Sequence, residues 1–359
     1  MSQINNFDLD NVDIYARYDP QDMLGCIKEL PSQCRRAWRA VGEFELPADY
    51  RDIDKVVVLG MGGSAIGGDL VRTLAENGSR VPVIVHRDYG LPAYVNERTL
   101  LIASSYSGST EETLSAFGPA LETGARMLAI TTGGKLGELA AAGHVPVFKI
   151  DYQAQPRAAL GFSFIPIIGI LQKLGFLPDK DDGVGEAVEV MEKLVNELDE
   201  KSPVVDNIAK QIAQRLHGKL AVIYGAGVLA EVAHRWKTQI NENGKSWAFH
   251  EAFPELNHNA TVGYAHPPEV IDKLRVIVLR SPLFNERIKL RYEVTGELLE
   301  RAGVPHEYLD STGESALAQM MGLIITGDFI SYYLGILNGI DPTPVEVISY
   351  LKDRLAKEK

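Results

Sequence analysis

The fold is decided by the stretch Leu59–Gly68, which reads LGMGGSAIGG. An apolar run at 56–59 leads into it, and a helix-compatible run at 69–74 follows it. A strand, a glycine-rich loop and a helix in this order place backbone N–H groups and a helix N-terminus around an anion. Because glycines let the backbone approach a ligand closely, we expect a binding loop here, to which Ser64 adds a hydroxyl.

The composition restricts the class of protein. The chain has 359 residues, 45% of them hydrophobic, and a net charge of −12. This length predicts two domains, and the acidic charge argues against nucleic-acid or membrane partners. Cys26 and Cys34 lack the spacing of a metal or redox motif. No secretory signal is apparent, and the apolar stretches at 158–171 and 321–337 contain polar residues, so we expect a cytoplasmic protein in which these stretches form the core.

Short apolar runs alternate with helix-compatible runs along the first half of the chain. Strands that alternate with helices indicate a parallel sheet with helices on both faces. Residues 22–41 are also predicted to be helical, and residues 158–176 to form a pair of buried helices. The predicted strands are 56–59, 82–86, 99–104, 127–131 and 145–150, and the helices between them are 69–76, 110–121 and 135–142.

The second half repeats this order, starting with an apolar strand at 220–224 that enters a second glycine turn at 225–227. The sequence therefore predicts an α/β fold with two domains, each a mostly parallel sheet flanked by helices in three layers. Further strands are predicted at 274–279 and 306–309, with helices within 184–217, from 229, at 285–302 and 313–336, and from about 343. We divide the chain into an N-terminal segment packed on the first domain (1–50), a first domain (51–185), and a second domain with a C-terminal helix (186–359).

A second motif, Ser104–Thr113, reads SSYSGSTEET and also follows a predicted strand and opens a helix. Ser109 or Thr110 is expected to cap that helix, with a glutamate completing a capping box. Capping needs one hydroxyl, whereas this loop offers five, at 104, 105, 107, 109 and 110. The excess suits a phosphate monoester, although a merely polar, capped turn is the alternative interpretation.

The glycine loop also fits a dinucleotide-binding fingerprint, because Gly60, Gly62 and Ala65 match G-x-G-x-x-G/A after a strand. That fingerprint expects an acidic residue about 20 positions further on. Here the second strand ends at His86 and is followed by Arg87, which could suit a 2′-phosphate. An oxidoreductase that uses NAD(P) therefore remains an alternative.

Together the two loops resemble the sugar isomerase (SIS) fold, and two motifs of the second half extend the resemblance. These are N-E-x-x-K at 241–245 and P-E-x-N-H-N at 254–259. Over residues 20–355 the chain is similar to the bifunctional phosphoglucose/phosphomannose isomerase family. This resemblance implies isomerisation of glucose 6-phosphate and mannose 6-phosphate to fructose 6-phosphate through a cis-enediol, without a metal or another cofactor.

Aldose–ketose isomerisation has chemical requirements that can be compared with the residues. A base must move a proton between C2 and C1, a second group must open the sugar ring, and positive charge must lie near the enediolate. Glu242 and His258 are a pair that could supply the first two functions, since histidine titrates near neutral pH. Taken alone, Glu242 would be interpreted as a solvated carboxylate. For His258, a surface position and a functional role are equally favoured.

The resemblance assigns roles to individual residues. Glu242 matches the proton-transfer base, and His258 matches a ring-opening residue that reaches in from the partner subunit of a homodimer. Arg157 matches a cation near the enediolate oxygens, and Lys352 matches a residue near the ring oxygen. The implied contacts of the sugar are Gly62, Gly63 and Ser64, and those of the phosphate are Ser105, Ser107 and Thr110.

A metal site is not expected from the sequence. The candidate ligands around the P-E-x-N-H-N motif fit no standard zinc spacing, and prolines interrupt any helix that would align them: His250, Glu251, His258 and His266. Besides the oxidoreductase, two alternatives stay open. One is a regulatory SIS module that binds a phosphosugar without catalysis, and the other is the isomerase domain of an aminotransferase.

Overall fold

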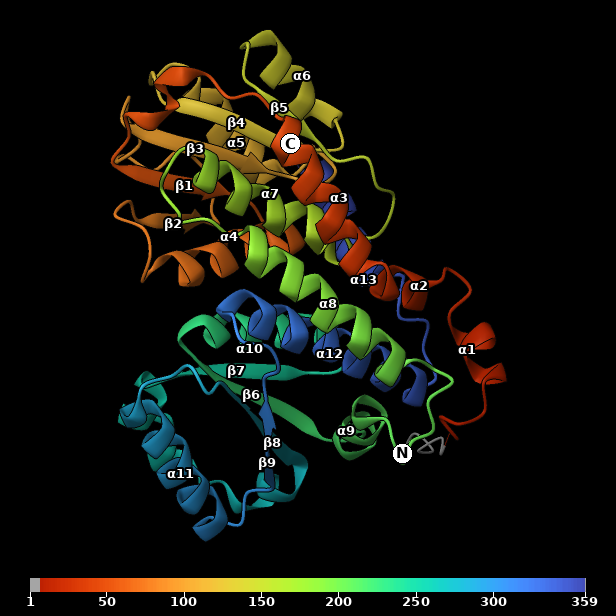
Figure 1. Cartoon of the computed structure of the whole chain (residues 1–359). Helices are drawn as coiled ribbons and strands as arrows, with labels where there is room; N and C mark the ends of the chain where they lie inside the picture. The colour runs from red at the N-terminus through yellow and green to blue at the C-terminus, as the bar shows by residue number, and fades with distance from the viewer. Residues whose placement is uncertain (1–6, 359) are drawn as a thin grey trace.

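The computed structural model describes residues 7–358 and contains two parallel sheets, one in each half of the chain (Figure 1). The first sheet has the strand order β2-β1-β3-β4-β5, and all of its neighbouring strands are parallel. Its strands are β1 (Lys55–Leu59), β2 (Val83–His86), β3 (Thr99–Ser104), β4 (Arg126–Thr131) and β5 (Val147–Lys149). The predicted strands of the first half are therefore confirmed.

Helices cover both faces of the first sheet. Val57 and Leu59 of β1 pack in one core cluster with Phe117, while Val56 and Val58 pack in another with residues of the opposite layer. This alternation follows from the two-residue period of a strand that is buried on both faces. The covering helices are α4 (Gly62–Ala75), α5 (Glu111–Ala120), α6 (Gly134–Ala142) and α7 (Leu160–Lys173). The predicted three-layer arrangement is confirmed.

The second sheet has the strand order β7-β6-β8-β9 and is also parallel. Its edge strand β7 was not predicted, because its sequence AFHEAF exposes Phe249 and Glu251 and so lacks an apolar run. The strands are β6 (Leu220–Ala226), β7 (Ala248–Phe253), β8 (Leu274–Arg280) and β9 (His306–Asp310). The helices α9 (Ile208–Leu216), α10 (Ala230–Glu242) and α11 (Glu286–Arg301) accompany them.

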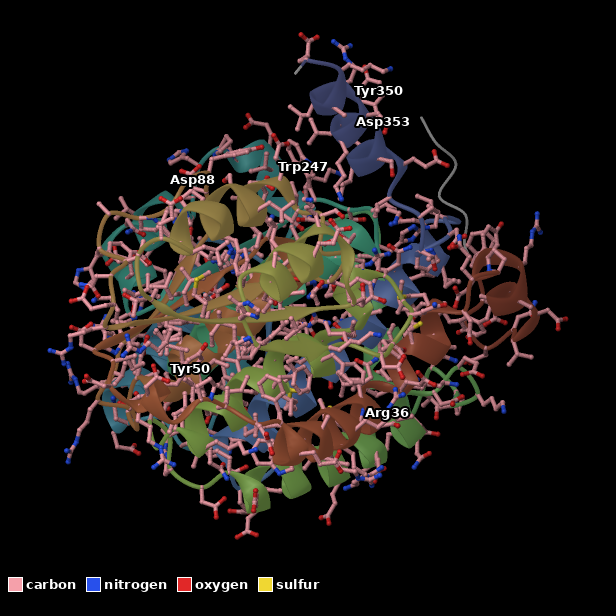
Figure 2. The ribbon with its side chains drawn as sticks, turned by 90° about the horizontal axis from the view of Figure 1, so that it is seen from above. Arg36, Tyr50, Asp88, Trp247, Tyr350 and Asp353 are labelled. Atoms are coloured by element: carbon pink, nitrogen blue, oxygen red, sulfur yellow. The ribbon has the colours of Figure 1, made fainter. Side chains whose placement is uncertain are left out.

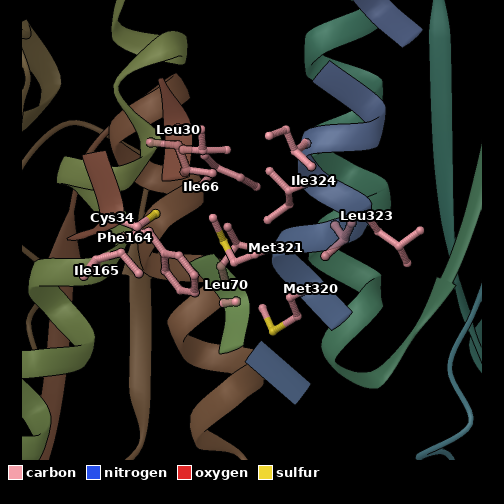
Figure 3. Close-up of a cluster of buried hydrophobic side chains, with 14 of the residues drawn as sticks. Leu30, Cys34, Ile66, Leu70, Phe164, Ile165, Met320, Met321, Leu323 and Ile324 are labelled. Atoms are coloured by element: carbon pink, nitrogen blue, oxygen red, sulfur yellow. The ribbon is translucent and has the colours of Figure 1, made fainter. Parts of the chain in front are cut away.

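A long apolar helix, α12 (Ala316–Leu337), lies between the two sheets (Figure 1). By length and composition α12 could cross a membrane, but it is entirely buried in the protein, as expected for a core helix. Figure 3 shows its Met320 and Met321 beside Leu70 and Phe164 of the first half. The two halves thus share one hydrophobic core.

Two helical segments differ from their prediction. The predicted helix at 22–41 is two helices, because Pro31 lies in the first turn of the second, where its missing N–H costs nothing. The predicted helix pair at 158–176 is wrong: a 3₁₀ turn at Pro156–Ala158 leads into the single helix α7. The N-terminal helices are α1 (Asp13–Tyr18), α2 (Met23–Lys28) and α3 (Leu30–Glu43), and a short turn, Ala48–Arg51, precedes β1.

The N-terminal segment and the domain boundary both involve α8 (Asp181–Leu198), which packs on α3 and on α12. The predicted division between 185 and 186 falls inside this helix and stays a prediction. Helix α3 also packs on α7 of the first half. Residues 1–6 of the predicted N-terminal segment lie outside the described residues.

The C-terminal helix α13 (Glu346–Lys357) has no buried residue. Figure 2 shows it projecting from the body of the protein, with Tyr350 and Asp353 along it and Trp247 near its foot. Several of its apolar side chains face solvent, among them Val347, Tyr350 and Leu351.

Candidate active site

The glycine loop follows β1 and packs against the turn that carries Arg157. Helix α4 begins at Gly62, whose φ of +50° lies in the left-handed region that favours glycine. A Cβ at Gly63 would lie 2.9 Å from the carbonyl oxygen of Pro156 and 3.1 Å from the Cα of Arg157. Ser163 of α7 donates a hydrogen bond to the Gly63 carbonyl at 3.1 Å. The absence of a side chain at Gly63 therefore allows the loop to reach Arg157.

The hydroxyl loop lies beside the glycine loop. The backbone N–H of Tyr106 donates to Ser64 Oγ at 3.2 Å, which joins the two loops directly. Ser105 Oγ and Thr110 Oγ1 are hydrogen-bonded to each other at 2.9 Å, and Ser107 is exposed. The structure thus gathers the predicted sugar and phosphate contacts at the carboxyl edge of the first sheet, where ligands of open α/β sheets bind.

The prediction that Ser109 or Thr110 caps α5 is confirmed for the position of Thr110 but is wrong for the hydrogen bond. Thr110 occupies the N-cap position, but its side chain makes no capping hydrogen bond to the helix. Its hydroxyl bonds to Ser105 instead. The first-turn N–H groups of α5 therefore have no side-chain cap, and the macrodipole of the helix favours an anion at this end.

Arg157 lies almost completely buried, with 3% of its surface exposed, between the two halves of the chain. Its Nε donates to Asn243 Oδ1 at 2.7 Å, and its Nη2 donates to the carbonyl oxygens of Pro342 and Thr343 at 2.8 Å each. Its Nη1 lies 3.5 Å from Glu242 Oε2. Burial lowers the pKa of Arg157 from its usual value. The structure thus brings the predicted base and the predicted enediolate cation together.

Glu242 is the last residue of α10 and is partly exposed. Lys245, three positions later, has a φ of +50° and donates through Nζ to the carbonyls of Glu242 and of Pro342, the latter at 2.9 Å. Burial, followed by the nearby Arg157, lowers the pKa of Lys245 to about 8. Lys245 is the lysine of the N-E-x-x-K motif, but no role was predicted for it, and Asn243 occupies a variable position of that motif and was not predicted to act.

Glu242 and Lys245 line a cavity of about 870 Å³. Its walls come from the start of β7 and from the segment that leads into α13, including the exposed Trp247 and Val347. The cavity thus has a charged end at Glu242 and an apolar wall that is partly formed by the projecting C-terminal helix.

The other two predicted catalytic residues, His258 and Lys352, are not among the described residues that line the cavity with Glu242. His258 is exposed and follows β7, whereas Glu242 precedes that strand. Since β7 has six residues, the strand alone separates its two ends by about 20 Å. Lys352 lies on the exposed helix α13.

A group of possible metal ligands lies elsewhere, between α4 and α10. The ligand atoms of Asp69, Glu231 and His234 all lie within 4.8 Å of one another. Arginines already pair with both carboxylates, however: Arg87 with Asp69, and Arg72 with Glu231 at 2.6 Å. These ion pairs compete with a metal. They also engage Arg87, the residue that the dinucleotide interpretation needs. The sequence could not reveal this group, because Asp69 lies about 160 positions before Glu231 and His234, in another helix.

The sequence of the chain is similar to those of proteins from other sources. It is 44% identical, over 94% of its length and the whole of the relative, to the bifunctional phosphoglucose/phosphomannose isomerase of Caldicellulosiruptor bescii. The protein of the same name from Aquifex aeolicus is 35% identical over 89% of this chain and 98% of that relative. This chain belongs to the bifunctional phosphoglucose/phosphomannose isomerase family.

Two further comparisons are consistent with the assignment of this chain to the phosphoglucose/phosphomannose isomerase family. Residues 205–355 match the family of the bacterial phospho-glucose isomerase C-terminal SIS domain. A hypothetical protein from Thermus thermophilus has a similar structure, with a TM-score of 0.71, 20% identity and coverage of 96% of this chain and 92% of that one. At this low identity the structural likeness concerns the fold alone, and it agrees with the two SIS-type domains predicted from the sequence.

Proposed function

We propose that this protein interconverts glucose 6-phosphate, mannose 6-phosphate and fructose 6-phosphate without a metal or another cofactor. The names of its relatives support this substrate class. The observation that carries the proposal is the buried Arg157 guanidinium, whose Nη1 lies 3.5 Å from the carboxylate of Glu242. A base and a fixed cation side by side are what proton transfer through an enediolate needs.

In the proposed reaction Glu242 removes the proton from C2 of the open-chain aldose. The electron pair of the broken C–H bond forms the C1–C2 double bond, and negative charge develops on the former carbonyl oxygen. The Arg157 cation stabilises this charge. The proton of the 2-hydroxyl then passes to O1, an electron pair of O2 forms the C2=O2 double bond, and the electrons of the C1–C2 double bond take up the proton that Glu242 returns to C1, which gives the ketose. Because Arg157 is held in place before substrate arrives, little reorganisation is needed when the charge appears.

The two loops of the first half position the substrate in this proposal. Ser105, Ser107 and Thr110 bind the phosphate, supported by the uncapped N-terminus of α5. The glycine loop, Gly62–Ser64, binds the sugar hydroxyls, supported by its contact with the Arg157 turn. Binding energy from the phosphate then holds C1 and C2 at Glu242.

Ring opening is assigned to His258 and Lys352 in a homodimer. His258 lies beyond the end of β7 and does not line the cavity that Glu242 of its own chain lines, which supports a role across an interface. The apolar side chains that α13 exposes support an association between copies. We further propose a cytoplasmic location, in keeping with two free cysteines among the described residues.

A turnover assay tests this function. The purified protein is incubated with each of the three hexose 6-phosphates, and the products are followed by NMR spectroscopy without coupling enzymes. We expect all three to interconvert after treatment with a chelator. Binding of a hexose phosphate without turnover would instead indicate a regulatory module, and consumption of added NAD(P)H would indicate an oxidoreductase.

A further inference from the structure

The acceptors of the Arg157 guanidinium are neutral. Its Nε and Nη2 donate to one side-chain amide and to the carbonyls of Pro342 and Thr343. Within residues 7–358, the carboxylate that lies within 4.0 Å of Arg157 is that of Glu242, and its separation of 3.5 Å is longer than a strong hydrogen bond. The guanidinium is therefore fixed in position by neutral groups, while the carboxylate beside its charge belongs to the proposed base, Glu242.

Asn243 supplies the side-chain amide, and its orientation is determined by a second hydrogen bond. Asn243 is completely buried, and its Nδ2 lies 3.1 Å from Ser331 Oγ on α12. Ser331 uses its own proton to donate to the Asp328 carbonyl at 2.8 Å. Its oxygen can therefore only accept from Asn243, so the amide oxygen of Asn243 must face Arg157.

The nearest buried carboxylate on α12 is already neutralised. Asp328 accepts two hydrogen bonds from Arg235, at 2.8 and 3.1 Å, and a third from Gln239 at 2.9 Å. Arg235 also donates to the backbone carbonyl of Arg157 at 3.2 Å. The backbone carbonyl of Arg157 is thus held by Arg235, whose own charge is paired with Asp328, whereas the Arg157 guanidinium is held by neutral groups.

We propose that Asn243 is a positioning residue that fixes the Arg157 guanidinium through a neutral acceptor and so keeps its charge available for the enediolate. A carboxylate at this position would hold the guanidinium equally well, but it would neutralise the charge. The enediolate exists only along the reaction path, so the effect should appear in kcat more than in KM. This inference rests on the proposed isomerase function.

The test compares the near-isosteric variant Asn243→Asp with the wild type. We expect kcat to fall about 100-fold, as when one stabilising donor of an oxyanion is lost, and KM to change less than about threefold. Asn285→Asp is the matched control: Asn285 caps α11 on the exposed surface, and aspartate caps a helix equally well. Its kcat should equal that of the wild type.

A binding measurement separates charge from general damage and does not depend on turnover. Inhibition or binding constants are measured for a five-carbon phosphorylated hydroxamate, which imitates the enediolate, and for glucitol 6-phosphate, which is an uncharged polyol at C1 and C2. In Asn243→Asp the hydroxamate should bind about 100-fold more weakly and glucitol 6-phosphate less than about threefold more weakly. Equal weakening of both ligands would overturn the inference.

A second variant guards against misfolding of the first. Ser331→Ala removes the acceptor of the Asn243 NH₂, whereas Arg157, which can only donate, still holds the amide oxygen. Asn243 and the guanidinium are then less firmly fixed, and we expect a selective loss of hydroxamate affinity of about 10-fold. If the wild type has no isomerase activity, the proposed function fails. If the wild type is active but Asn243→Asp keeps its kcat and its hydroxamate affinity, the inference about Asn243 alone fails.

Discussion

The buried ion pair between Arg235 of α10 and Asp328 of α12 should make Asp328→Asn strongly destabilising. Both side chains are nearly inaccessible, and the carboxylate receives three hydrogen bonds, two from Arg235 and one from Gln239. Burial raises the pKa of Asp328, and the Arg235 guanidinium opposes that rise. In the variant, an NH₂ group replaces one of the two carboxylate oxygens. The N–H groups of Arg235 or Gln239 that donated to this oxygen then face another donor.

The expected loss of unfolding free energy is about 3–5 kcal/mol, because an arginine is left buried without its counter-charge. This is a large part of the 5–15 kcal/mol that typically separates folded from unfolded domains. The double variant Arg235→Met/Asp328→Leu removes both charges and should recover most of the loss. We expect it to lie within about 1–2 kcal/mol of the wild type, since the hydrogen bond from Arg235 to the Arg157 carbonyl is still missing.

Urea unfolding at one fixed protein concentration measures both variants. Trp236 is a suitable fluorescent reporter, because it is buried on α10 and donates to the Leu323 carbonyl of α12 at 2.7 Å. The reasoning is refuted if Asp328→Asn loses less than about 1 kcal/mol. It is also refuted if the double variant is no more stable than the single one.

Three further results are expected. Arg157→Ala should lower kcat by about 100- to 1,000-fold and change KM much less, measured by steady-state kinetics with fructose 6-phosphate, because the enediolate charge appears only during the reaction. Ser107→Ala should raise KM about 10-fold at nearly constant kcat, and an unchanged KM would contradict the phosphate assignment. Burial, and then His234, lowers the pKa of His250 to about 4. The unfolded chain therefore binds this proton between pH 6.5 and 4 while the folded one does not, so His250 should cost about 1–2 kcal/mol of stability on going from pH 7.5 to 5. His250→Gln should remove that part of the pH dependence in urea titrations.

The sequence predicted the features of this fold that depend on local pattern. Strands with a continuous apolar run, such as β1 and β3, were recognised, and parallel pairing then placed the loops after them at one edge. The edge strand β7 was missed, because Phe249 and Glu251 face solvent and interrupt the apolar run. Helix α7 was mistaken for two helices, because an apolar run without polar faces does not show where one helix ends.

Of the candidate site, the sequence predicted the motifs but not the contacts between them. The loops stand out in the sequence, and Glu242 was identified through the resemblance of its motif to the family. The contacts that surround Arg157, however, come from residues up to 186 positions away. No local sequence pattern predicts that Asn243 accepts a hydrogen bond from Arg157 or that Asp328 neutralises Arg235. The cap of α5 shows the same limit, since Thr110 stands where a cap belongs but bonds to Ser105.

The measurement that tests the central proposal most directly is proton transfer by the Glu242→Gln variant in D₂O. The wild type should convert glucose 6-phosphate and place solvent deuterium at C1 of fructose 6-phosphate. The variant keeps the shape of the side chain but not the base, so exchange and turnover should fall together by about 100- to 10,000-fold, while glucitol 6-phosphate still binds with unchanged affinity. Exchange at a rate near that of the wild type would contradict the assignment of Glu242 as the base.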